Sequence, residues 1–144
     1  MGDLNTIYRY EADRYQALVS REDYQNHLLP AILSIDALTD KFVLELGAGT
    51  GRLSRLIAPI AGRLVVTDLS LHMLAYGQAF ACDVGAGAYP AAVATHRALP
   101  FQPASADLVI AGWSFCYAAL NAVEGWRAGL EMALGEVDRV LRPG

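Results

Sequence analysis

The sequence predicts an α/β domain with a mostly parallel sheet that is covered on both faces by helices. Short apolar runs typical of buried strands alternate with longer segments whose apolar residues recur at helical spacing. Strands that alternate with crossover helices form a parallel sheet between two helical layers. The 144 residues, with a hydrophobic fraction of 54%, suffice for a single domain with a buried core.

The predicted elements follow in order along the chain. Two helices, over 5–20 and 22–38, form an N-terminal helical cap within residues 1–40, and Pro30 is a possible kink in the second. Residues 41–144 form the core of the domain. Its strands are predicted at 42–46, 63–67, 91–95 and 106–111, and its helices at 50–60, from the N-cap Ser70 through Phe80, and at 124–141. The last helix carries an apolar stripe, formed by Leu130, Ala133, Leu134, Val137 and Leu141.

Composition excludes several classes of function. The net charge of −4 and the absence of a basic stripe argue against nucleic acid as a partner. The longest apolar stretch falls short of the ~18 residues needed to span a membrane, so we predict no membrane partner. The N-terminus does not resemble a signal peptide, and Cys82 and Cys116 form no C-x-x-C pair, which suits the cytoplasm. The three histidines share no ligand spacing, so no metal site is predicted.

The glycines at 47, 49 and 51 directly follow the first predicted strand. Such a turn lets a ligand approach the backbone, and the N-terminus of the next helix attracts negative charge. The dinucleotide fingerprint would need a further glycine at position 52, where Arg52 stands, so an NAD-type oxidoreductase is disfavoured. Asp68 follows the second strand, where a carboxylate can accept both ribose hydroxyls of a nucleoside; the alternative is that it starts a turn or caps the next helix.

Four blocks of the sequence resemble, in order, the motifs of class I S-adenosylmethionine-dependent methyltransferases. Residues 43–51 (Val-Leu-Glu-Leu-Gly-Ala-Gly-Thr-Gly) resemble the first motif, and 66–70 with Met73 and Leu74 the second. Residues 97–101 and 105–109 resemble the third and fourth motifs, and 139–144 the turn before a fifth strand. The resemblance implies a Rossmann-like three-layer sandwich with S-adenosyl-L-methionine as cofactor. It also implies that the chain stops before the last strands of the fold, so another chain, the N-terminal helices or further residues should cover the sheet edge. A homodimer is one such arrangement.

The resemblance also implies a set of cofactor-binding residues. The glycine turn would pack on the methionine portion with Glu45 near its amino end, Asp68 would hold the ribose, and apolar residues would flank the adenine. The full set is Glu45, Gly47, Ala48, Gly49, Thr50, Gly51, Asp68, Leu69, Met73, Ala98, Leu99 and Trp113. Thr95 stands where the family usually has an acidic residue at the adenine amino group.

Methyl transfer from a sulfonium asks the protein mainly for alignment and exclusion of water, so no catalytic residue is assigned. The predicted function is transfer of a methyl group from S-adenosylmethionine to a small-molecule acceptor that the sequence does not identify. The segment after the fourth strand, residues 111–114, lacks the Asn-Pro-Pro-Tyr pattern of adenine and glutamine methyltransferases. The alternative is a module that binds the cofactor but is catalytically incomplete and serves a partner.

Overall fold

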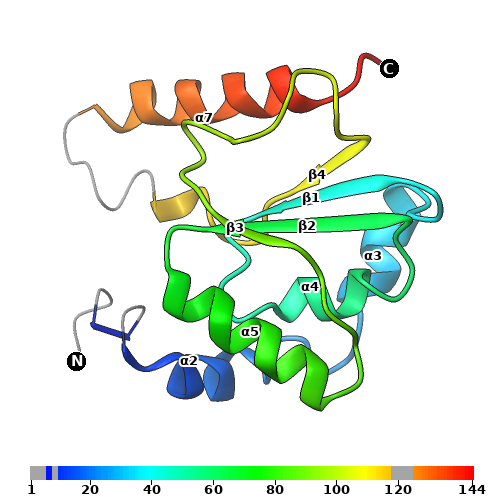
Figure 1. Cartoon of the computed structure of the whole chain (residues 1–144), viewed down its shortest axis with the longest axis vertical. Helices are drawn as coiled ribbons and strands as arrows, with labels where there is room; N and C mark the ends of the chain where they lie inside the picture. Colours follow the sequence, from blue (N-terminus) through cyan, green and yellow to red (C-terminus); the bar gives the residue numbers. More distant parts are fainter. Residues whose placement is uncertain (1–5, 8–9, 118–124) are drawn as a thin grey trace.

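The sheet of the computed structural model, which describes residues 6–7, 10–117 and 125–144, consists of four parallel strands. They are β1 (Phe42–Leu46), β2 (Arg63–Asp68), β3 (Ala91–Val93) and β4 (Leu108–Ile110), in the order β3-β2-β1-β4. Three layers are visible in Figure 1, with the sheet between helices on its two faces. The predicted fold class is therefore confirmed.

The central strands are apolar because both of their faces are covered. Val43, Leu44 and Leu46 of β1 have no exposed surface. On one face lie α3 (Leu28–Ile35), α4 (Arg52–Ile57) and α5 (Leu71–Asp83), and on the other lies α7 (Trp126–Val140). The side chains of β1 alternate between two core clusters, Val43 packing in one and Leu44 with Leu46 in the other. Each fully buried leucine contributes about 1.5–3 kcal/mol to stability.

The second N-terminal helix is shorter than the sequence predicts. The structure has α2 (Ala12–Val19) and α3, with a turn between them. Asp23 lies in this turn and caps the start of α3, because its Oδ1 accepts hydrogen bonds from the backbone N–H groups of His27 and Leu28, at 2.9 and 3.3 Å. Pro30 lies in the first turn of α3, where a missing N–H costs no helical hydrogen bond, and it is therefore not a kink. Within the predicted first helix, 5–20, Thr6, Ile7 and Tyr10 are also helical, and residues 5, 8 and 9 lie outside the described residues.

The core helices begin close to their predicted positions. Ser70 caps α5 as predicted, its Oγ accepting from the N–H of Met73 at 3.2 Å. In α7 the buried face is rotated from the predicted stripe, because Ala133 and Val140 are buried whereas Leu134 is half exposed. Val140 fills the cluster beneath β1 and β4, so the helix end sets this rotation.

Strand β4 is an edge of the sheet in the part of the chain that the structure describes, pairing there with β1 alone. Asp107 fixes its start, since Oδ2 accepts from the N–H of Phe42 at 2.7 Å and Oδ1 from Arg142 at 2.5 Å. What covers the outer side of β4 stays a prediction. No helix within the described ranges is both long and apolar enough to cross a membrane.

Candidate functional site

The glycine loop after β1 has a conformation that depends on its glycines. Gly47, Gly49 and Gly51 have φ values of +69°, +57° and +80°, in the left-handed region. A Cβ added to Gly47 would collide with the Cβ of Ser114, whose own Oγ donates to the carbonyl of Leu46 at 3.0 Å. The backbone at Gly47 therefore has neither the dihedral angle nor the space for a side chain.

Asp68, at the end of β2, ties the glycine loop to the start of α5. Its Oδ2 accepts from the N–H of Gly49 and its Oδ1 from the N–H of Ser70, each at 2.8 Å. The turn-forming role that the sequence left open is therefore present. Two carboxylate oxygens carry about four acceptor positions, so capacity for ribose hydroxyls remains. The ribose contact itself stays a prediction.

Glu45 brings a buried carboxyl group to the same edge of the sheet. It is 2% exposed, and its Oε2 accepts a hydrogen bond from the Oγ of Ser54 at 2.6 Å. Burial raises the pKa of Glu45 to about 7, and the bond from Ser54 and the charge of Arg55 only partly oppose this rise. A positively charged group of a ligand next to Glu45 would stabilise the ionised form of its carboxylate.

A cavity of about 30 Å³ separates the glycine loop from α2; Tyr15 and Val19 of α2 line it together with Glu45, Gly47, Ala48, Thr50, Arg52, Leu53 and Gly112. The buried Gln16 holds α2 there, since its Oε1 accepts from the Oγ1 of Thr50 at 2.6 Å and from Arg55 at 3.4 Å. This volume is about that of one water molecule. A ligand larger than a water molecule does not fit within this cavity as the structure has it.

The remaining predicted residues lie in different surroundings. Leu69 is 71% exposed beside Asp68, and Ala98 is also exposed. Met73 and Leu99 are core residues instead, with 0% and 5% exposure, and the Leu99 N–H donates to the Oε2 of Glu136 at 2.6 Å. In this structure, the side chains of Met73 and Leu99 therefore expose little surface that could make the predicted contacts with adenine.

Trp113 lies outside the glycine loop, at the end of β4. Its side chain is 64% exposed, and the guanidinium carbon of Arg52 lies 4.4 Å from the centre of its ring. The indole lines a second, open cavity rather than the narrow one under α2. The predicted cofactor contact of Trp113 stays a prediction.

His96 packs against the glycine loop from the loop after β3. Its ring centre lies 5.2 Å from that of Phe115, and its Cε1 lies 3.4 Å from a Cβ built on Gly47. Among the groups that the structure describes, none hydrogen-bonds its buried Nδ1. Burial lowers the pKa of His96, which favours the neutral imidazole. A neutral imidazole with an unused nitrogen therefore stands beside the loop.

Several residues at this site had no signal in the sequence. Gln16, Ser54 and Ser114 meet the glycine loop and Glu45 only through tertiary packing. Tyr15 and Tyr10 belong to a tyrosine-rich segment that suggests a lid, and Tyr15 does line the cavity, whereas Tyr10 is 73% exposed. Tyr8 of the same segment lies outside the described residues.

Comparison with known proteins connects this geometry to a family. The sequence model of a family described as methyltransferase domain matches residues 44–144, which include the end of β1, the glycine loop, Asp68 and α7. The chain belongs to the methyltransferase-domain family. The methyltransferase domain uses S-adenosylmethionine as its cofactor.

Solved structures with the same fold include several methyltransferases. The YcgJ protein of Bacillus subtilis is 23% identical with a TM-score of 0.67, covering 81% of this chain and 47% of its own. A putative S-adenosyl-L-methionine-dependent methyltransferase of Methanococcus maripaludis is 18% identical with a TM-score of 0.75, covering 95% and 61%. Phosphoethanolamine N-methyltransferase 1 of Haemonchus contortus, solved with phosphoethanolamine and S-adenosylhomocysteine, is 21% identical with a TM-score of 0.61, covering 94% and 30%.

These identities support a shared fold, and the methyltransferase domain described here spans about half the length of the first two of these proteins. The comparison with curated proteins finds no match.

The residues of this site fit the chemistry of the cofactor. S-adenosylmethionine carries an ammonium group, a sulfonium and a ribose with two hydroxyls. The buried carboxyl of Glu45 suits a cation, and the oxygens of Asp68 suit hydroxyl donors. Gly47, Gly49 and Gly51 leave three positions of the loop without a side chain. The acceptor groups of the site therefore match the donor groups of the ligand.

Proposed function

We propose that this methyltransferase domain transfers the methyl group of S-adenosylmethionine to a small-molecule acceptor. The observation that carries the proposal is the convergence of two carboxyl groups on one glycine loop. Asp68 hydrogen-bonds the loop at Gly49, and Glu45 lines the cavity beneath α2. The net charge of −4 argues for a small acceptor rather than a nucleic acid.

Each residue of the site would have a distinct role. Asp68 would accept the ribose hydroxyls while keeping its bonds to the N–H groups of Gly49 and Ser70. Glu45 would pair with the ammonium group of the cofactor. Leu69, exposed beside Asp68, would cover one side of the adenine. The loop from Gly47 to Gly51 would pass beneath the methionine portion.

The cofactor supplies an activated methyl group on a positively charged sulfur. The chain supplies binding, alignment and exclusion of water. Tyr15 and Val19 of α2 would close over the bound cofactor, because they line the cavity next to the glycine loop. Gln16, bonded to Thr50, would return α2 to the same position after each opening.

The test is a transfer assay with S-adenosylmethionine labelled in its methyl group and a broad panel of phenols, amines, thiols and carboxylic acids. We expect label to appear in at least one acceptor, and Asp68→Ala to abolish this transfer. Asp83→Ala is the matched control, since Asp83 is an exposed aspartate at the far end of α5. Cofactor binding without transfer to any acceptor favours the alternative, a module that binds the cofactor and acts through a partner.

A further inference from the structure

A second cavity lies next to the one beneath α2. It is open, has a volume of about 500 Å³ and is lined by Glu22, Asp23, His27, Leu28, Ala31, Arg52 and Trp113. This volume falls within the range of small-molecule sites in proteins. Arg52 lines both cavities, and the neighbouring residues Gly112 and Trp113 line one each. The two cavities therefore meet at Arg52, and a molecule in the second lies next to the glycine loop.

Trp113 has an unusual conformation for an aromatic residue. Its φ is +58°, in the left-handed region that costs a residue with a side chain on the order of 1 kcal/mol or more. The side chain gains little burial in return, because it is 64% exposed. The Sγ of Cys116 donates to its carbonyl at 2.8 Å and helps to hold this turn. A strained backbone that presents an exposed indole to a cavity is a feature of binding sites.

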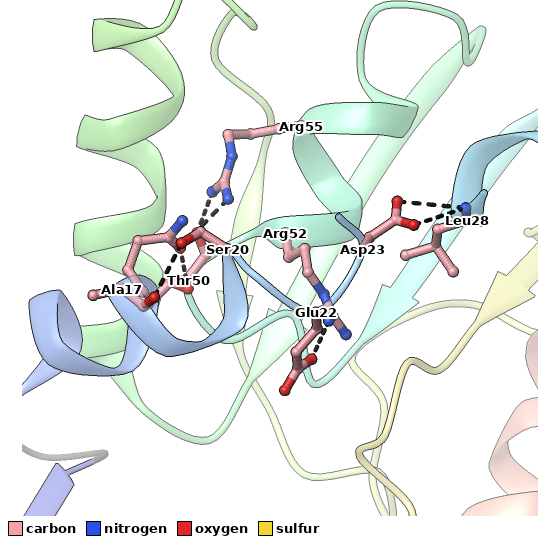
Figure 2. Close-up of polar contacts among 9 residues, drawn as sticks. Ala17, Ser20, Glu22, Asp23, Leu28, Thr50, Arg52 and Arg55 are labelled. Atoms are coloured by element: carbon pink, nitrogen blue, oxygen red, sulfur yellow. Dashed lines mark hydrogen bonds and ion pairs between the residues drawn. The ribbon is translucent and has the colours of Figure 1, made fainter. Parts of the chain in front are cut away.

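Arg52 is held in place on two sides and is not open to a further anion. Its guanidinium forms an ion pair with Glu22 (Figure 2) and stacks on Trp113, and its side chain is only 17% exposed. Asp23 adds a second carboxylate to the wall of the cavity. With two carboxylates and one guanidinium, the acidic and basic groups of the cavity wall sum to a net negative charge, which disfavours an anionic ligand.

The other walls are apolar or can accept a proton. Leu28 and Ala31 come from α3 and form an aliphatic side. His27 precedes α3 and brings an imidazole to the same cavity. An aromatic ligand with one nucleophilic group matches these walls. Its ring could stack on the indole of Trp113, and the imidazole of His27 could accept the proton of its nucleophilic group.

We propose that this second cavity receives the methyl acceptor, and that the acceptor is a phenol or an aromatic amine without negative charge. The proposal deepens the proposed function and rests on it. The acceptor oxygen or nitrogen forms a bond to the methyl carbon as the carbon–sulfur bond breaks, and the sulfur keeps the electron pair. The acceptor loses its proton to the imidazole of His27, which passes it to solvent.

Three phenols with the same ring test the charge preference by calorimetry: tyramine (cationic), 4-ethylphenol (neutral) and 3-(4-hydroxyphenyl)propionate (anionic). We expect tyramine and 4-ethylphenol to bind, and the propionate to bind about tenfold more weakly or not at all. Trp126→Phe leaves Trp113 as the single tryptophan, so saturable quenching of its fluorescence by tyramine locates the ligand. Tightest binding by the propionate, or binding by none of the three, overturns the proposal.

Trp113→Gly is the decisive variant, because glycine accepts the positive φ and the fold should tolerate the change. We expect it to weaken the binding of tyramine about tenfold. Trp126→Phe is the matched control and should bind tyramine as the wild type does. Wild-type affinity for tyramine in Trp113→Gly overturns the proposal. Failure of the wild type to bind S-adenosylhomocysteine counts against the proposed function instead, so the two failures are distinguishable.

Discussion

The ends of β1 and β2 differ in construction from the end of β4, although all three strands stop at the same edge of the sheet. At the inner ends, positive φ values fall on glycines, and the carboxyl groups of Glu45 and Asp68 are hydrogen-bonded to their surroundings. At the outer end, the positive φ falls on Trp113, whose side chain is exposed. The inner region, at the ends of β1 and β2, therefore holds one fixed geometry. The outer region, at the end of β4, exposes an aromatic surface at the cost of backbone strain.

Gly47→Ala should produce the largest loss in the inner region. The substitution adds backbone strain at φ +69° and a collision with Ser114, so we expect a loss of about 3–4 kcal/mol in the free energy of unfolding. Gly85→Ala is the matched control, since Gly85 has φ +74° but open space around it, and it should cost only about 1 kcal/mol. Urea denaturation measures both. Equal losses in the two variants would show that the collision with Ser114 contributes nothing to the destabilisation.

The pKa of Glu45 makes a prediction about pH. The folded pKa of about 7 exceeds the ordinary value of 4.5, so the unfolded chain loses this proton first as the pH rises. Stability should therefore fall between pH 4.5 and 7, by up to about 3 kcal/mol, and level off above pH 7. Glu45→Gln should remove this part of the decline in urea denaturation. A parallel decline in the variant would contradict the assignment to Glu45.

Asp68→Ala should weaken cofactor binding. The variant loses two hydrogen bonds between a charged group and backbone N–H groups, and the N–H of Gly49 is no longer fixed. We expect at least about a tenfold loss of affinity for S-adenosylhomocysteine, measured by calorimetry. Asp83→Ala should keep wild-type affinity. An unchanged affinity in Asp68→Ala would remove this residue from the site.

Trp113→Gly should have the smallest effect on stability, and it completes the comparison between the two regions. Relief of the positive φ and loss of the stacking with Arg52 act in opposite directions, so we expect a net change below about 1 kcal/mol in urea denaturation. A loss as large as that of Gly47→Ala would mean that the outer region is as rigid as the inner one.

The sequence predicted what depends on neighbouring residues. The glycine loop, the acid at the end of β2 and the Ser70 cap are each encoded within a few positions, and all lie where expected. The parallel sheet followed from the alternation of apolar runs and helical segments. The late start of the second N-terminal helix, at Leu28, did not follow, because the side chain of Asp23 caps that start.

What depends on distant packing could not be predicted. Gln16 is 34 positions from Thr50, and no periodicity indicates that they bond. Leu99 is buried because it packs in the core cluster of Leu44 and Val140, and its N–H donates to Glu136, 37 positions away. The stripe of α7 was wrong at Leu134, since the contacts of Val140 with the sheet set the rotation of the helix.

The central claim is that the ends of β1 and β2 hold S-adenosylmethionine rather than a dinucleotide. The most direct measurement is calorimetric titration of the wild-type chain at pH 8 with S-adenosylhomocysteine and, in parallel, with NAD. We predict saturable binding of S-adenosylhomocysteine with one site per chain and no binding of NAD. Binding of NAD with no binding of S-adenosylhomocysteine would contradict the account.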